Sequence, residues 1–255
     1  RHIDLSNTKF WSGNIGQGTF TVNIEKYTKL KDLNISSSIV TSISLPNASL
    51  ALLNITNSAV EGISLVNQPF LDRLDFSGCK RLKTVTIDSC DKITELNLSN
   101  LGDLHTIRIT SCPNLKSIIC TNNVNLTTFN VSNCNNVEII NVSQCTNESL
   151  TVYIVGVPNI KELNVSSTNT PNDIQVASSL PNLRTLNISN SQVSAIQYGN
   201  AAIPTYKENK IFDISKLNLT SLSVQNAKGV HYFKFDNNRN TPFNVGGSFF
   251  VGCSN

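Results

Sequence analysis

Residues 93–145 decide the fold, and they read ITELNLSNLGDLHTIRITSCPNLKSIICTNNVNLTTFNVSNCNNVEIINVSQC. Within this stretch a pair of apolar residues spaced two apart recurs every eleven residues, as in Leu96/Leu98, Ile107/Ile109 and Ile118/Cys120. The same step holds from Ile63 to Ile140, and an apolar residue three positions earlier completes each unit as L-x-x-L-x-L. Because side chains two apart on a strand share a face, this fixed register predicts stacked coils of short strands rather than a globule with one centre.

The pattern continues in both directions with small slips in spacing. Upstream it steps by ten residues, and downstream it reaches Phe233/Phe235. A Pro-Asn-Leu sequence or a relative of it precedes every second unit, at Pro69, Pro113, Pro158 and Pro181. The full coil is therefore expected to contain about 21 to 22 residues, with one short strand on each of two faces. Face A is defined by its first inward residues, Leu33, Leu53, Leu74, Leu96, Ile118, Ile140, Leu163 and Leu186, and face B carries the units between them.

Several face A segments, such as LKDLNISSS (30–38), ITELNLSNL (93–101) and LRTLNISNS (183–191), fit the pattern L-x-x-L-x-L-x-x-N/C. In this the chain resembles the leucine-rich-repeat family over nearly its whole length. The resemblance implies that face A is the parallel sheet lining the binding side. One departure is that face B also has the pattern of strands, which predicts a flatter solenoid than the horseshoe of the family.

We therefore predict a mainly β, right-handed leucine-rich-repeat solenoid of about eleven coils, with short parallel strands on both faces. A single domain would span residues 1–255: an N-terminal capping coil at 1–29, regular repeats at 30–198, and irregular coils with a cap at 199–255.

The resemblance extends to bacterial surface proteins with 22-residue repeats, such as internalin-like adhesins. It implies a non-enzymatic binding or adhesion module with a protein or glycan partner, outside the cell or on its surface. Since the chain starts at Arg1 and lacks Met, we expect that a secretion signal or lipid anchor has been removed. The alternative is a passive spacer or display stalk that carries other parts of a cell-surface protein.

Composition narrows the partner classes. A net charge of +3 over 255 residues is weak, so nucleic acid and anionic membranes are unexpected partners. The sequence has no apolar run of about twenty residues, so we expect no membrane insertion. We also expect a monomer. The histidines, His2, His105 and His231, lie at no recognised catalytic spacing, and no phosphate loop or metal motif occurs, so we predict neither enzyme activity nor a cofactor.

The cysteines follow the same repeat. Cys79, Cys90, Cys112, Cys134 and Cys145 each stand eight residues after the leading apolar residue of a unit. Residues 22 apart on stacked coils lie about 5 Å from each other, but aligned side chains disfavour disulfide geometry. The spacing favours buried free thiols over a disulfide or metal framework.

Two groups of outward residues are candidates for ligand binding. On face A, stacking should align Asn97, Asn141, Asn164 and Asn187 in a ladder of amides, followed by a ladder of hydroxyls. These ladders would either hydrogen-bond up and down the stack as a structural device, or present a flat surface to a repetitive ligand such as a glycan.

The second group lies near the C-terminus, where the repeat is interrupted between Gly199 and Lys210. Tyr206, Lys207, His231, Tyr232 and Lys234 could form an exposed aromatic and basic patch of the kind found in interaction hot spots. Alternatively, this segment simply caps the last coil.

Overall fold

The structure is a computed structural model that describes residues 1–8, 20–169, 174–176, 180 and 182–193, together with the backbone of four further strands. Face A carries β1 (His2–Asp4), β3 (Asp32–Asn34), β5 (Leu52–Asn54), β8 (Glu95–Asn97), β10 (Ser117–Ile119), β12 (Ile139–Asn141), β14 (Glu162–Asn164), β16 (Thr185–Asn187) and β19 (Ser221–Ser223). Face B carries β2 (Thr21–Asn23), β4 (Ser42–Ser44), β6 (Gly62–Val66), β7 (Thr84–Asp88), β9 (Thr106–Thr110), β11 (Thr128–Ser132), β13 (Thr151–Val155), β15 (Ile174–Val176) and β17 (Ile196–Tyr198). A separate pair is formed by β18 (Ile211–Asp213) and β20 (Tyr232–Lys234).

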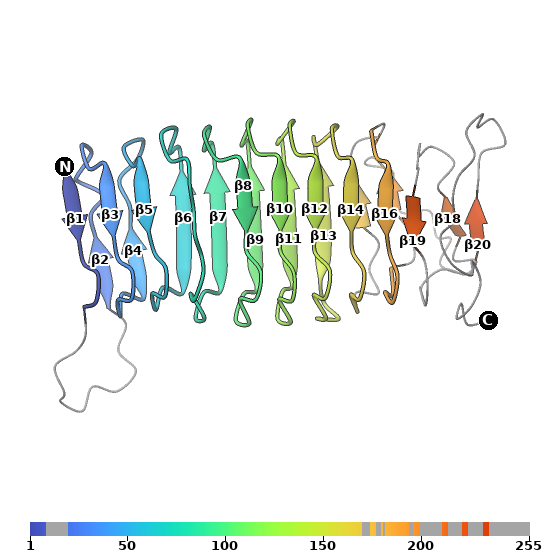
Figure 1. The fold of residues 1–255 in the computed structure, drawn as a ribbon, viewed down its shortest axis with the longest axis horizontal. Coiled ribbons are helices and arrows are strands. Elements are labelled where there is room, and N and C mark those ends of the chain that lie inside the picture. Colours follow the sequence, from blue (N-terminus) through green and yellow to red (C-terminus); the bar gives the residue numbers. More distant parts are fainter. Residues whose placement is uncertain are drawn as a thin grey trace, which may run out of the picture.

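These strands stack into a two-faced solenoid, which confirms the predicted fold class (Figure 1). Strand pairing is parallel throughout, and on face A the residue opposite Leu96 is Ile118, which in turn faces Ile140. No helix occurs in the part of the chain that the structure describes. The seven-stranded sheet on face B corresponds to about seven continuous turns, fewer than the eleven coils expected, since the sheets are interrupted near the N-terminal end.

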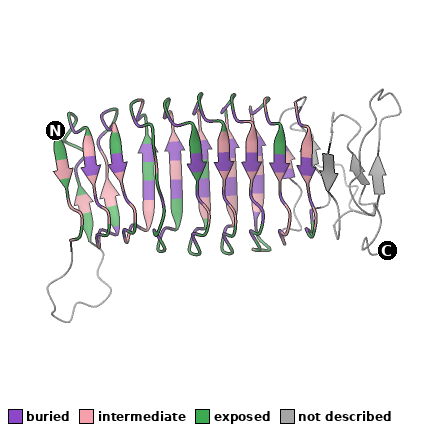
Figure 2. Ribbon diagram, viewed as in Figure 1, coloured by how far each residue is buried: buried purple, intermediate pink, exposed green. Residues whose placement is uncertain are grey.

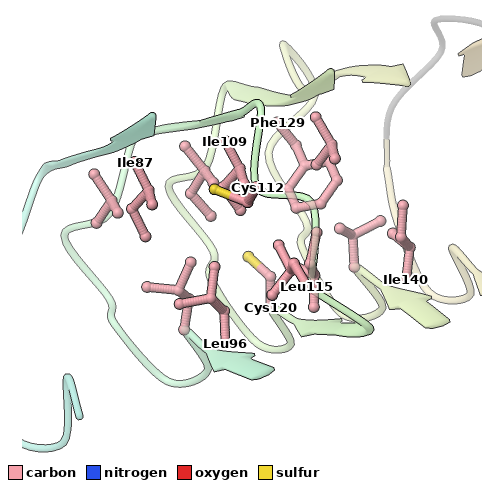
Figure 3. Packing of buried hydrophobic residues seen from close by; sticks show 14 of the residues in the cluster. Ile87, Leu96, Ile109, Cys112, Leu115, Cys120, Phe129 and Ile140 are labelled. Atoms are coloured by element: carbon pink, nitrogen blue, oxygen red, sulfur yellow. The ribbon is translucent and has the colours of Figure 1, made fainter. Parts of the chain in front are cut away.

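The core is a thin layer between the two sheets. Leu96 and Ile140 point inward from face A and meet Ile87, Ile109 and Phe129 from face B (Figure 3). All five side chains are at most 1% exposed. Figure 2 shows buried residues alternating with more exposed ones along the strands of the central coils. The inward assignment made from the sequence is therefore correct for these five residues.

Tight corners follow the strands, and they explain the richness in Asn and Ser. A residue with positive φ occupies most of these corners, for example Asn100 at 61° and Asn122 at 59° on the face A side. Asn tolerates the left-handed region better than most residues because its short polar side chain can bond locally. The next residue turns inward and caps the strand: Thr168 Oγ1 donates to Val165 O at 2.9 Å, and Ser191 Oγ donates to Ile188 O at 2.6 Å.

The cysteines belong to the same corner positions. Cys79, Cys90, Cys112, Cys134 and Cys145 are buried and unpaired, as is Cys120 inside face A. Cys145 Sγ donates to Cys120 O of the preceding coil at 3.1 Å, whereas the corner hydroxyls bond within their own coil. Burial raises the pKa of the Cys90 thiol from 9.0 to about 12, which keeps it protonated at neutral pH.

The solenoid has a seam where both sheets break at the same place. Face A has no strand between β5 and β8, and face B has no ladder between β4 and β6 (Figure 1). The seam separates an N-terminal block, β1 to β5, from a central block that starts at β6. The step between equivalent face A residues changes here, from 20 residues between Leu33 and Leu53 to 22 between Leu74 and Leu96. The change in step coincides with the break, but it does not by itself explain the lost ladder, because the central face A sheet stays in register across steps of both 22 and 23 residues.

Leu74 departs from its predicted place at this seam. The repeat predicts a face A strand at Leu74 and Phe76, yet residues 71–76 form no strand and Leu74 is only partly buried. The joint is held instead by a few bonds. Asn57 N–H donates to Ser77 O at 2.8 Å, and the buried Gln68 donates through Nε2 to Pro46 O at 2.6 Å while its Oε1 accepts the Leu50 N–H at 3.0 Å. A fully bonded side chain therefore replaces part of the missing sheet.

Candidate binding surfaces

The predicted amide ladder is present on face A. Its Oδ1 atoms, however, do not form the hydrogen bonds up and down the stack that a structural ladder would have. The Oδ1 atoms of Asn97, Asn141, Asn164 and Asn187 each accept the backbone N–H of the hydroxyl residue two positions later, at 3.0 to 3.1 Å. The amides therefore stabilise the turn within their own coil, rather than the contact with the next coil. Their role in binding a ligand stays a prediction.

The predicted C-terminal patch is only partly in view. Tyr206, Lys207 and His231 lie outside the described residues. Tyr232 and Lys234 belong to β20, whose central residue Phe233 pairs with Phe212 of β18, but their side chains are not described. Whether these five residues form one surface stays a prediction as well.

Face B offers the wider surface. Its strands β6, β7, β9, β11 and β13 contain five residues each, whereas every described face A strand contains three. Longer strands leave three outward positions per coil in place of two. The first outward position is threonine in four consecutive coils, Thr84, Thr106, Thr128 and Thr151, aligned by the sheet register.

The middle outward row of face B has larger side chains. Arg108 of β9 faces Asn130 of β11, which faces Tyr153 of β13, and Gln175 of β15 continues the row. Arg108 is exposed and the other three are half-buried. We name Arg108, Asn130 and Tyr153 the face B row. Arginine and tyrosine are enriched among the residues that dominate protein–protein binding energies.

Asn130 has a feature that neither neighbour shares. Its Oδ1 atom is buried yet has no hydrogen-bond partner among the described residues. An unsatisfied buried acceptor costs about 1–3 kcal/mol. Such atoms are rare in folded proteins and call for an explanation, which a ligand donor would provide.

Charged residues of face B pair at its margin. Lys83 Nζ lies 2.9 Å from Glu61 Oε2, and Arg81 also contacts this carboxylate. Hydrogen bonding from Lys83 lowers the pKa of Glu61 from its ordinary value. On the other side of the solenoid, Lys161 pairs with Glu138 at 2.8 Å and lowers its pKa in the same way. These exposed ion pairs lie outside the face B row, in which Arg108 is the single cation.

The corner that leads into face A carries a second regular feature. Asn114, Asn136, Asn159 and Asn182 occupy equivalent positions, and each donates through Nδ2 to a backbone oxygen of the preceding coil, at 2.7 to 3.3 Å. We name these residues the corner ladder. The two coils before it have Lys92 and Phe70 at the same position. The ladder therefore ends where the seam begins.

The described residues contain no group of three or more His, Cys, Asp or Glu side chains placed to hold a metal ion. Within the same residues, no helix has the length and apolar character needed to cross a membrane. A hollow of about 370 Å³ lies at the N-terminal end, lined by Arg1, His2, Ile3, Tyr27 and Leu30. It holds no acid–base pair of the kind that catalysis needs.

Sequence reasoning did not single out the face B row. The signal is present for Arg108 and Asn130, which each stand between the two inward residues of a face B unit. For Tyr153 the sequence prediction is wrong: the repeat predicts Tyr153 and Val155 as the inward pair, whereas the structure buries Val152 and Ile154. The family resemblance favours face A instead, because it implies that face A lines the binding side. The greater strand length of face B becomes visible only when the coils are stacked.

Comparison with known proteins adds a family. A family model described as "At1g61320/AtMIF1, LRR domain" matches residues 23–207. No match is found among curated proteins or among solved structures.

Proposed function

Since the chain belongs to the leucine-rich-repeat family described by that model, we propose that it is a non-enzymatic module that binds a partner protein through the central strands of face B. Solenoids of this family are commonly protein-binding scaffolds. The observation that carries the choice of surface is the aligned face B row, in which an unsatisfied Asn130 acceptor stands between Arg108 and Tyr153.

The setting of the row favours recognition. Inward residues on either side of Asn130, Phe129 and Val131, are fully buried, so the strand backbone that presents the row is rigid. A rigid surface loses little entropy on binding. The flanking threonines present hydroxyl groups that can bond a partner around the central contacts.

Other expectations from the sequence remain part of this proposal. The module would act outside the cell or on its surface, as a monomer, in adhesion like that of internalin-like proteins. The face A amides and the C-terminal patch are alternative contact surfaces, and a glycan is the alternative partner. A passive spacer is the rival function, and it requires no contact surface at all.

The test is a binding screen of the described protein against arrays of proteins and of glycans, followed by paired variants. Arg108→Ala combined with Tyr153→Ala removes the ends of the row. The matched control is Glu95→Ala combined with Glu162→Ala, which changes two exposed outward residues of face A. We expect the first variant to weaken capture of a protein hit at least about tenfold, and the control to retain it.

If the face A double variant lost capture and the face B double variant kept it, the partner would bind face A instead. Hits from the glycan array alone would contradict the choice of a protein partner. If no array yielded a specific hit, the spacer would become the better description.

A further inference from the structure

A small cluster crosses the seam on its outer surface. Phe70 takes the place that an asparagine holds in the corner ladder, and its side chain is 46% exposed. The Nζ atom of Lys31 lies 4.5 Å from the centroid of the Phe70 ring, and that of Lys92 lies 6.0 Å from it. Lys31 comes from the N-terminal block, whereas Phe70 and Lys92 come from the central block.

A second exposed apolar residue belongs to the coil between them. Lys31 O accepts the backbone N–H of Ala51 at 2.8 Å, so Lys31 lies one coil before β5. The next residue, Leu52, points outward from β5 and is 52% exposed. Phe70 belongs to the following coil. We name Lys31, Leu52, Phe70 and Lys92 the seam patch.

The two lysines of the patch are not paired with carboxylates of any described residue. Neither forms an ion pair within the described part of the chain, although Asp32 and Asp91 adjoin them in sequence. Lys83 and Lys161, by contrast, each pair with a glutamate of the preceding coil. An ammonium group over an aromatic ring keeps its full charge and its N–H donors, so it can still bind an anion.

We infer that the seam patch is a second interaction site, which takes an acidic segment of a partner protein whose carboxylates bond Lys31 and Lys92 while an apolar side chain packs on Phe70 and Leu52. Charge complementarity selects this occupant: the patch combines two unpaired cations with two exposed apolar side chains. The cation–π contacts hold the ammonium groups in place before binding, which lowers the entropy cost of each new bond. This site is separate from face B and does not depend on it.

The test uses short synthetic peptides with Asp or Glu on both sides of a Leu or Phe, and matching peptides in which Asn or Gln replaces the acids. Binding is measured by fluorescence anisotropy at low and at high salt. We expect the unmodified protein to prefer the acidic peptides at least about fivefold, and the preference to shrink as salt screens the charges.

Two variants and a control then locate the site. Phe70→Asn restores the corner-ladder residue, and Lys31→Gln combined with Lys92→Gln removes both cations. Each should abolish the preference while the melting temperature stays close to that of the unmodified protein. The control is Val124→Asn, which changes a side chain equally exposed at 46% in the central block.

Equal binding of acidic and neutral peptides would overturn the inference, as would a preference that survives both seam variants or is lost in the Val124→Asn control. Since no face B residue is altered, these results stand whether or not the face B proposal holds.

Discussion

At the scale of single residues, a substitution of Asn130 tests whether its side chain serves a partner or stabilises the coil. If its unsatisfied acceptor serves a partner, the fold alone should be better without it. We predict that Asn130→Val raises the free energy of unfolding by about 1 kcal/mol, because valine removes the unpaired oxygen and suits a strand. Urea denaturation measures this change.

Asn97→Val is the matched control, since its Oδ1 accepts the Ser99 N–H at 3.1 Å. That variant should lose about 0.5–1 kcal/mol. Destabilisation by Asn130→Val as well would mean that its amide supports the coil as those of face A do.

The Cys90 thiol provides a second prediction at this scale. Its folded-state pKa of about 12 lies above the ordinary value of 9.0, so folding favours the protonated form. The stability that this shift contributes is complete below pH 9 and is lost as the pH rises towards 12. The unfolding free energy should therefore fall more steeply between pH 8 and pH 11 in the unmodified protein than in Cys90→Ala. Parallel pH profiles of the two proteins would show that Cys90 does not contribute.

At the scale of elements, the corners carry the strictest backbone demands. Gly78 has φ of +74°, and a Cβ there would collide with the side chain of Asn57 and lie 3.2 Å from its Cα. We predict that Gly78→Ala costs about 1–3 kcal/mol. The control is Gly102→Ala, where a Cβ would have open space, and its effect should stay within about 0.5 kcal/mol. Thermal melting of both variants checks the difference.

The elements also show how far the sequence could lead. Inward residues such as Leu96 and Ile118 could be assigned because an identical repeat places identical side chains in the core. Leu74 fits the same repeat but forms no strand, so the apolar pattern alone does not decide which segments pair. Of the two expectations for the face A amides, bonding up and down the stack does not describe their Oδ1 atoms, which accept an N–H of their own turn, since an asparagine at the end of a strand can bond either its own turn or the next coil.

The binding surfaces were harder to foresee for a related reason. Phe70 looks like one more exception in an imperfect repeat until the lysines of two blocks are seen to converge on it. Lys31 and Lys92 are 61 positions apart in sequence, and no pattern links them.

At the scale of the whole molecule, we expect the seam to divide the solenoid into two cooperative parts. Stability in a repeat protein comes from each coil and its contacts with direct neighbours. Residues 72–75 form no ladder with either neighbour on face A, whereas β10 is bonded on both sides. Hydrogen exchange followed by mass spectrometry should show faster exchange at 72–75 than at Ser117–Ile119. Equal protection would mean that the seam closes in solution.

The central block should also depend on each inward residue. Leu96 is 1% exposed and belongs to β8, which is an end strand of its sheet and pairs only with β10. Leu96→Asp would bury a charge without a partner, so we expect a loss of several kcal/mol, seen as a lower melting temperature. An unchanged melting curve would contradict the inward position of Leu96.

The lengths of the coils limit which deletions and duplications the gene for this protein can tolerate. Within the central block, excising the codons from Leu96 to Ser117 would remove one whole coil of 22 residues and leave Ile118 in the place of Leu96, so the shortened chain would still close its turns. A deletion of the same size that began at Leu33 would run to Asn54 and leave Ile55 in the place of Leu33, two residues out of step with the local coil length of 20 residues. Duplication and loss by unequal crossing-over should therefore be tolerated where the exchanged segment matches the local coil length, and selected against where it does not.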